Sequence, residues 1–174
     1  MNYSEIKNYD IANGPGVRVT LFVSGCTHRC EGCFNEVTWD FDYGSPFDES
    51  VQEKIISDLS PDYIAGLTLL GGEPLEYANL QALLPLVRTV KKMYPKKDIW
   101  CYTGYRFEED VLEKFCEQWD AMKEFLSYID VLVDGEFILE QKDISLQFRG
   151  SANQRIILVQ ESLRSGETVL WTGK

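Results

Sequence analysis

Three cysteines stand close together in the run SGCTHRCEGCFN. Cys26, Cys30 and Cys33 have the spacing Cys-x3-Cys-x2-Cys. Thiolates on such a short loop are typical ligands of iron–sulfur clusters. Four thiolates complete the ligand set of a cubane cluster, so three leave one iron open to an outside ligand, as a catalytic metal site requires. The spacing therefore predicts a [4Fe–4S] cluster with one open position.

Zinc is the alternative occupant of this loop, with His28, Cys101 or Cys116 as a fourth ligand. Zinc motifs usually combine two paired half-sites, and the sequence has no second pair of closely spaced cysteines. Cys101 and Cys116 fall in an expected strand and an expected helix, where a free cysteine is typically a small core residue. A zinc-stabilised binding module without catalysis remains the alternative from a different functional class.

Three more turns follow apolar runs and contain candidate site residues. They are GGEP from Gly71, YTGY over 102–105 and DGEF from Asp134. Gly71 and Gly72 allow close backbone approach at the end of a strand. Asp134 fits a ligand or cation contact as well as a helix cap.

The elements that must position these turns alternate along the chain. Apolar runs predict strands, and helical spacing with start signals predicts helices between them. The expected strands are 17–25, 64–72, 98–104 and 129–137; the expected helices are 45–59, 80–94 and 108–126; 155–160 and 168–172 read as a closing hairpin. Pro85 is expected to kink or delay the second helix.

This alternation predicts an α/β fold with a mostly parallel, curved sheet. About four strand–helix units are too few for a closed eight-unit barrel, so a partial, open βα barrel is expected over residues 1–174 as a single domain. The functional turns then meet at the carboxyl edge of the strands, where such folds bind ligands.

Composition limits the kinds of partner and compartment. The chain has 174 residues, a net charge of −11 and a pI near 4.6. An acidic surface argues against binding nucleic acid or an anionic membrane. The sequence contains neither a long apolar run nor a secretory signal, and its cysteines are odd in number. We therefore expect a protein of the reducing cytoplasm.

The cysteine motif and the GGEP turn together resemble the radical S-adenosylmethionine (SAM) superfamily. The resemblance implies that the open iron binds the amino and carboxylate groups of SAM. It also implies reductive cleavage of SAM to methionine and a 5′-deoxyadenosyl radical. The implied cluster ligands are Cys26, Cys30 and Cys33, and the implied SAM-binding residues are Gly32, Cys33, Phe34, Gly71, Gly72, Glu73 and Asp134.

The superfamily usually has an aromatic residue before the third cysteine, whereas this chain has Gly32 there and Phe34 after it. The backbone of 32–34 is still expected to border the adenine. Glu73 is expected to accept from the methionine ammonium, and the space above Gly72 is expected to belong to the methionine end of SAM.

Longer runs point to a narrower group. GPGVRVTLFVSGCTHRCEGCFN and Thr38-Trp39 are similar to activases of glycyl radical enzymes, and RGSANQRI (149–156) resembles the activating proteins of anaerobic (class III) ribonucleoside-triphosphate reductase. The resemblance implies abstraction of a hydrogen from a backbone glycine of that reductase. It also implies an electron donor such as flavodoxin or ferredoxin. Another short radical SAM enzyme, acting on a different activase target or a small molecule, is the alternative.

For several residues the sequence allows more than one interpretation. Arg149, Asn153 and Arg155 either orient SAM or the partner, or anchor the last strand. Arg18 either tunes the cysteine loop or is a solvated strand residue. His28 either shields the cluster or faces solvent, and a role as catalytic base is the less favoured alternative. Thr103 and Tyr105 either reach the SAM ribose or close a turn, and we favour the turn. The aromatic residues of the loop after the cysteines form either a docking patch or loop packing: Trp39, Phe41, Tyr43 and Phe47.

Overall fold

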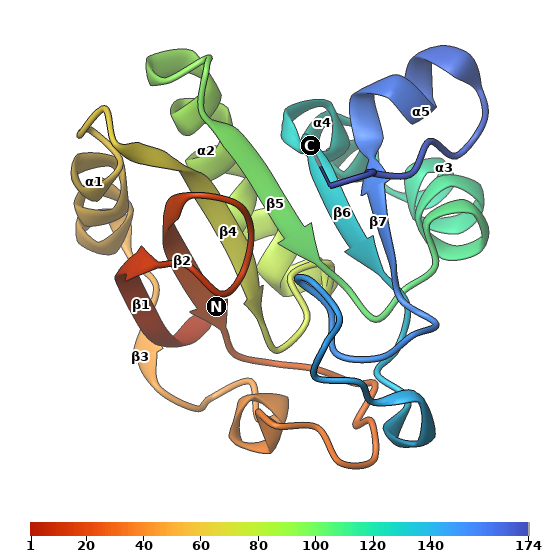
Figure 1. Cartoon of the computed structure of the whole chain (residues 1–174). Helices are drawn as coiled ribbons and strands as arrows, with labels where there is room; N and C mark the ends of the chain where they lie inside the picture. Colours follow the sequence, from red (N-terminus) through yellow and green to blue (C-terminus); the bar gives the residue numbers. More distant parts are fainter. Residues whose placement is uncertain (174) are drawn as a thin grey trace.

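The computed structural model describes residues 1–173, which form one seven-stranded open sheet with helices (Figure 1). The strand order is β3-β1-β2-β4-β5-β6-β7. The four central strands β2, β4, β5 and β6 are parallel, and the remaining pairs are antiparallel. The strands are β1 (Asn2–Asp10), β2 (Val17–Val23), β3 (Ser45–Pro46), β4 (Ile64–Gly71), β5 (Asp98–Tyr102), β6 (Val131–Asp134) and β7 (Arg155–Leu158).

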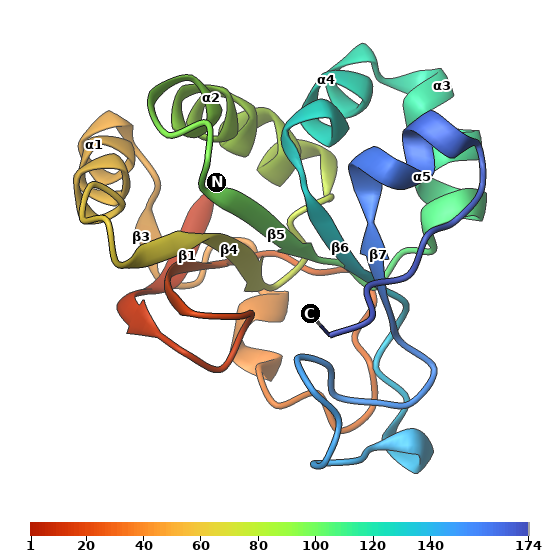
Figure 2. The same ribbon diagram turned by 45° about the horizontal axis from the view of Figure 1, so that its top comes forward.

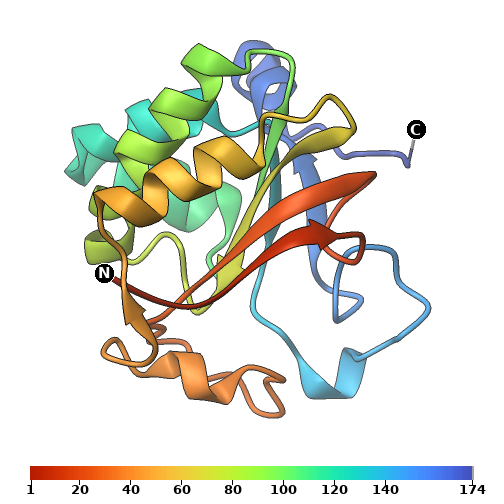
Figure 3. The same ribbon diagram turned by 90° about the vertical axis from the view of Figure 1, so that its left-hand side faces the viewer.

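Helices cover one face of this sheet, and long loops lie on the other side (Figures 2 and 3). The α-helices are α1 (Glu49–Asp58), α2 (Tyr77–Met93), α3 (Cys116–Gln118), α4 (Asp120–Tyr128) and α5 (Val159–Ser165). Three further helical segments are η1 (Glu36–Trp39), η2 (Phe107–Phe115) and η3 (Leu139–Gln141). The loop segments around η1 and η3 lie on the side of the sheet away from the helices (Figure 2).

The sheet is buried on both faces because its strands alternate between two apolar clusters. In β2, Val19, Leu21 and Val23 join the large core under the helices. On the other face, Trp100 and Val133 belong to a second, smaller cluster. Side chains in a strand alternate between faces, so one strand serves both clusters. The central strands are therefore held rigidly from both sides.

The α/β class and the first two helices are confirmed. Helix α1 begins after Asp48, whose side chain accepts a hydrogen bond from the Val51 amide at 3.1 Å, as an N-cap does. Helix α2 starts at Tyr77, earlier than expected, and runs through Pro85. The expectation that Pro85 delays the helix was wrong, because the proline lies two turns inside it.

Other expectations about the elements need correction. The single helix expected over 108–126 is interrupted at Trp119, whose extended backbone separates α3 from α4. The closing hairpin forms only in part: residues 159–165 form α5 in place of a simple turn, and the segment after α5 pairs antiparallel with β7 at the Ile157–Leu170 bridge. Strand β1, which pairs antiparallel with β2, was not expected from its polar sequence.

Within residues 1–173, no helix combines the length and the apolar character needed to cross a membrane.

Candidate functional site

A cavity of about 350 Å³ opens at the carboxyl edge of the central strands. Cys26, Cys30 and Cys33 all line it, together with Gly71 and Gly72 from the end of β4. The structure thus brings the cysteine motif and the GGEP turn, which are about forty residues apart, to one place. A further wall comes from the loop after β6, and its lining residues are Phe137, Leu146, Phe148, Arg149, Gly150 and Gln154.

The cysteine loop is closed at its neck by backbone hydrogen bonds. The amide of Gly25 donates to the Thr38 carbonyl at 2.8 Å, and the amide of Cys26 donates to the Trp39 carbonyl at 3.2 Å. Gly25 has a φ of 98°, and a Cβ there would lie 2.3 Å from the ring of Phe41. A side chain at this position is therefore excluded both by the backbone conformation and by Phe41.

The three thiols are partly buried and free of disulfides. Burial raises the pKa of Cys26 to about 11, and the charge of Glu73 adds to the rise. Burial also raises the pKa of Cys30. In the described part of the chain, no three His, Cys, Asp or Glu side chains are gathered tightly enough to hold a single metal ion. Three thiols that line one cavity fit a larger, thiolate-bound group. Such a group deprotonates its cysteine ligands when it binds.

The candidate fourth ligands for zinc are engaged elsewhere. Cys101 and Cys116 are buried in the large core beneath the helices, as the sequence indicated. Both nitrogens of His28 contact carboxylates, Nε2 that of Glu73 at 3.1 Å and Nδ1 that of Glu136 at 3.0 Å. Neither the buried thiols nor the imidazole therefore presents a free donor to the cysteine loop.

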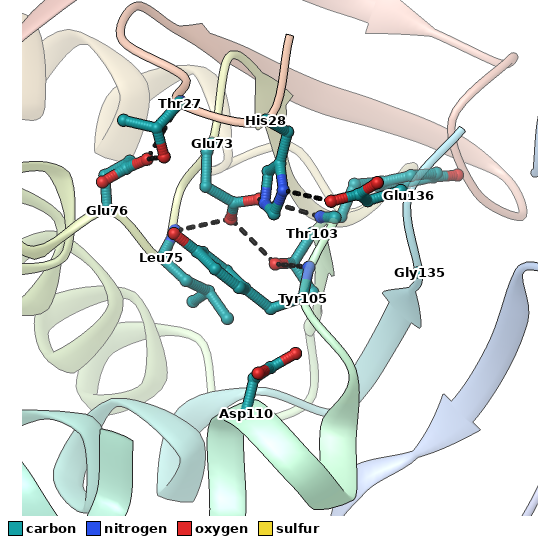
Figure 4. A network of polar contacts seen from close by, with 12 residues as sticks. Thr27, His28, Glu73, Leu75, Glu76, Thr103, Tyr105, Asp110, Gly135 and Glu136 are labelled. Carbon is teal, nitrogen blue, oxygen red and sulfur yellow. Dashed lines mark hydrogen bonds and ion pairs between the residues drawn. The ribbon is translucent and has the colours of Figure 1, made fainter. Parts of the chain in front are cut away.

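Glu73 is almost completely buried and is the centre of a polar network beside the cavity (Figure 4). One oxygen of its carboxylate accepts from the Leu75 amide at 2.9 Å and the Thr103 hydroxyl at 2.8 Å. The other accepts from the Gly104 amide at 2.8 Å and contacts His28. Four donors occupy the four acceptor positions of a carboxylate. The side chain thus organises three loops of the site and does not line the cavity.

His28 is held between two carboxylates rather than facing solvent. Burial opposes its protonation, but the hydrogen bonds and charges of Glu73 and Glu136 prevail and raise the pKa of His28 to about 9. The Tyr105 ring packs edge-on against the imidazole, with centroids 4.4 Å apart. Protonated His28 therefore ties the cysteine loop to the loops after β4 and β6 (Figure 4).

Gly71 and Gly72 allow other backbone segments of the chain, and not only a ligand, to come close to them. A Cβ on Gly72 would lie 2.6 Å from the Gly25 carbonyl oxygen and 2.9 Å from that of Thr38. A Cβ on Gly71, whose φ is 111°, would lie 2.6 Å from the Val23 carbonyl oxygen. The space above Gly72 thus belongs to the neck of the cysteine loop, contrary to the expectation that it serves the ligand.

Phe34 lies at the mouth of the cavity and is 81% exposed. Its ring meets that of Phe137 edge-on, with centroids 6.4 Å apart. Gly32, with a φ of 70°, lies against Leu139, and a Cβ there would come within 2.8 Å of the leucine side chain. The turn 32–34 therefore borders the cavity from the side of the loop after β6.

Asp134 is an anchor in this structure and does not line the cavity. Its carboxylate accepts from the Phe107 amide at the start of η2 at 2.9 Å and forms an ion pair with Arg155. Arg155 also pairs with Glu108 at 2.6 Å. Asp134 does not occupy the N-cap position of a helix; it binds the first amide of η2 from β6 and makes a cation contact with Arg155. Of the two interpretations of Arg155, the structure shows the anchor of the last strand.

Arg149 and Asn153 have different positions. Arg149 lines the cavity, donates from Nη1 to the Gln154 carbonyl at 2.8 Å, and has a buried Nε without a protein partner. Asn153 donates to the Glu136 carbonyl at 2.8 Å and so orders the loop after β6.

Thr103 accepts from the Tyr105 amide at 3.1 Å, which closes the turn that the sequence favoured.

Two further interpretations are corrected. Arg18 is neither solvated nor near the cysteines: it is fully buried and pairs with Asp98 at 2.7 Å, at the opposite end of the sheet. The aromatic set after the cysteines divides. Trp39 lines the cavity, and Phe47 packs against Tyr3 with centroids 6.4 Å apart. The rings that stay exposed are Phe41 and Tyr43, at 40% and 42%.

The sequence reasoning missed Thr27, Glu76 and Glu136. Glu76 accepts from both the amide and the hydroxyl of Thr27, which joins the cysteine loop to the residue before α2. Glu136 belongs to the DGEF turn, so its position after a strand was the available signal. For Thr27 and Glu76 no such signal exists, because their pairing depends on how two distant loops meet.

The comparisons with known proteins agree with this site. Residues 12–157 match the family described as a 4Fe-4S single cluster domain. The anaerobic ribonucleoside-triphosphate reductase-activating protein of Haemophilus influenzae is 50% identical over 158 residues, covering 90% of this chain and 97% of that protein. The protein of the same name from Vibrio cholerae is 49% identical, with the same coverage. That of Escherichia coli K12 is 44% identical over 156 residues, covering 88% and 96%. This chain therefore belongs to the family of anaerobic ribonucleoside-triphosphate reductase-activating proteins.

Proposed function

We propose that this chain activates anaerobic ribonucleoside-triphosphate reductase by installing a glycyl radical on it, using a [4Fe–4S] cluster and SAM. The observation that carries the proposal is the meeting of the three thiols and the GGEP turn at one cavity. Family membership supports the reductase as the protein substrate.

The cluster ligands in this proposal are Cys26, Cys30 and Cys33. Three thiols line the cavity and the other two cysteines lie in the core, so the chain supplies three thiolates and no fourth. Three thiolates on a cubane cluster leave one iron for an exchangeable ligand. The neck formed by Gly25 and Thr38 holds the loop that carries all three.

SAM is the exchangeable ligand in this proposal. A cavity of about 350 Å³ is in the size range of small-molecule sites. We place SAM between the cysteine loop and the loop after β6, with Phe34 and the backbone of Gly71 bordering it and Arg149 as a cation facing it. Bound together, the two groups supply one-electron cleavage of the S–C5′ bond of SAM, giving methionine and a 5′-deoxyadenosyl radical.

The chain's own residues hold the cavity in shape and limit water. Phe22, Leu70 and Tyr102 line its floor from β2, β4 and β5. This face of the sheet works, in our proposal, as the inside of a partial, open barrel. Apolar walls protect a reactive radical from solvent. Glu73 and His28 keep the surrounding loops in register through the network described above.

The reductase itself completes the enclosure. Exposed aromatic side chains stand at the cavity and on the loop after η1: Phe34, which lines the cavity, and Phe41 and Tyr43. Aromatic side chains are typical anchors of protein interfaces. A glycine-bearing segment of the reductase that covers the cavity both presents the hydrogen to be abstracted and excludes water. A reducing protein such as flavodoxin or ferredoxin supplies the electron.

Anaerobic reconstitution tests the proposal. The full chain is loaded with iron and sulfide, reduced, and mixed with SAM in the presence and absence of an anaerobic reductase. We expect a glycyl radical signal by electron paramagnetic resonance only when chain, SAM and reductase are all present, and none with Cys30→Ala. SAM cleavage that is fast without the reductase and consumes a small molecule instead would favour the alternative radical SAM enzyme. A protein that binds zinc and takes up no iron would overturn the proposal.

A further inference from the structure

We propose that Asn79 is the positioning residue that holds the cysteine loop in register with the GGEP turn. The inference rests on the proposed function, because register matters when a cluster on one loop and SAM on the other must meet. Asn79 lies in the first turn of α2 and is 1% exposed. It contains no thiol, carboxylate or imidazole, and no motif of the sequence includes it.

The side-chain amide nitrogen of Asn79 reaches both loops at once. It contacts the carbonyl oxygens of Ser24 at 3.0 Å and Gly25 at 3.4 Å, at the base of the cysteine loop. It also donates to the carbonyl of Glu73 at 2.9 Å, within the GGEP turn. One rigid helix thus holds the backbone of both motifs through a single buried group.

The contacts determine which way the amide points. An asparagine amide has a donating nitrogen and an accepting oxygen. Turning it over would place Oδ1 against three carbonyl oxygens, which is repulsive. In the observed orientation Oδ1 is buried and has no hydrogen-bond partner in the described structure. The site therefore uses Asn79 as a donor only, which an aspartate at this position would not provide.

The backbone supplies only part of this link. The Glu73 amide donates to the Gly25 carbonyl at 2.8 Å, so that carbonyl keeps a partner without Asn79. The Ser24 carbonyl receives no other donor in the described structure. Loss of the amide thus leaves a buried carbonyl without a partner, directly before the cysteine loop. Such a group shifts to regain a hydrogen bond, and the cysteine loop moves with it.

The test compares three variants at two positions of α2 in the full chain, reconstituted anaerobically. Asn79→Leu removes the donors at similar volume, and Asn79→Ser is a milder variant that keeps one donor in case the first fails to fold. Leu83→Ala is the matched control, since Leu83 is buried in the core one turn further on and contacts neither loop through a polar atom. Iron content, thermal stability and the SAM dissociation constant are measured for each.

We expect the Asn79 variants to keep the iron content of the unchanged protein and to bind SAM about tenfold more weakly. Leu83→Ala is expected to lose thermal stability and to keep its SAM affinity. Unchanged SAM affinity in Asn79→Leu and Asn79→Ser, or an equal loss in Leu83→Ala, would overturn the positioning role. If the unchanged protein takes up the cluster but does not bind SAM, the proposed function itself fails, and the inference fails with it.

Discussion

The imidazole of His28 lies 3.1 Å from the carboxylate of Glu73, across 45 positions of sequence. His28 stands inside the cysteine motif and Glu73 inside the GGEP turn, so the two motifs touch through their own side chains. Burial of Glu73 removes this contact from competing water, which strengthens it. The site is therefore one connected unit, and changes in either loop are expected to affect the other.

Replacement of any one of Cys26, Cys30 or Cys33 by alanine is expected to abolish the reconstituted cluster, because no spare thiol faces the cavity. Cys116→Ala serves as the control and should keep full iron and sulfide content, since that side chain packs in the core. Iron and sulfide analysis with visible absorption measures both. Full iron content in Cys30→Ala would refute the ligand assignment.

Gly72→Val is expected to lower cluster content as well as SAM affinity. The new Cβ would lie 2.6 Å from the Gly25 carbonyl oxygen, so the neck of the cysteine loop has to open. Iron content after reconstitution and SAM binding by equilibrium dialysis measure the two effects. Gly166→Ala is a useful comparison, because this glycine also has a positive φ but has open space around it, far from the site. A Gly72→Val protein with a normal cluster that fails only to bind SAM would show that the space serves the ligand after all.

Tyr43→Ala is expected to weaken activation of the reductase without changing SAM binding or stability. The ring is 42% exposed on the loop after η1, and an exposed aromatic is a typical interface anchor. Glycyl radical yield as a function of reductase concentration measures the effect. Phe47→Ala separates docking from packing: its ring packs on Tyr3, so this variant should lose about 1–3 kcal/mol of unfolding free energy. Normal radical yield with Tyr43→Ala at limiting reductase would remove this residue from the docking surface.

The ion pair of Glu108 with Arg155 predicts a specific acid sensitivity. The hydrogen bonds from Arg155 hold the pKa of Glu108 at about 2, below the usual value of about 4.3. A carboxyl whose pKa is lowered by folding stabilises the folded state above its unfolded pKa, and this contribution is lost as the pH falls towards the folded pKa. We therefore expect unfolding midpoints to drop between about pH 4.3 and 2.

Glu108→Gln tests the origin of this acid sensitivity. The variant should be less stable than the unchanged protein at neutral pH, and the difference between the two should shrink as the pH falls below about 4. Urea titrations at several pH values measure it. A difference that stays constant down to pH 2 would assign the acid sensitivity to other carboxyls.

The sequence by itself determined the chemistry and the class of fold. Cys26, Cys30 and Cys33 are close neighbours in the chain, so their grouping needs no tertiary information. The runs that became β2, β4, β5 and β6 are rich in apolar residues, because most side chains of a strand buried on both faces lie in the core. The parallel order of these strands follows from the helices between them.

Only the tertiary structure decided which polar side chains reach the cavity and which serve as anchors. Asp134 ends β6 and Glu73 follows β4 at the same edge of the sheet. Both carboxylates accept from donors in distant parts of the chain, which is a property of how loops meet in the fold. The polar strand β1 forms because it pairs along β2, and its own pattern carries no such signal. Asn79 shows the same limit: its role arises from three carbonyls that no sequence spacing brings together.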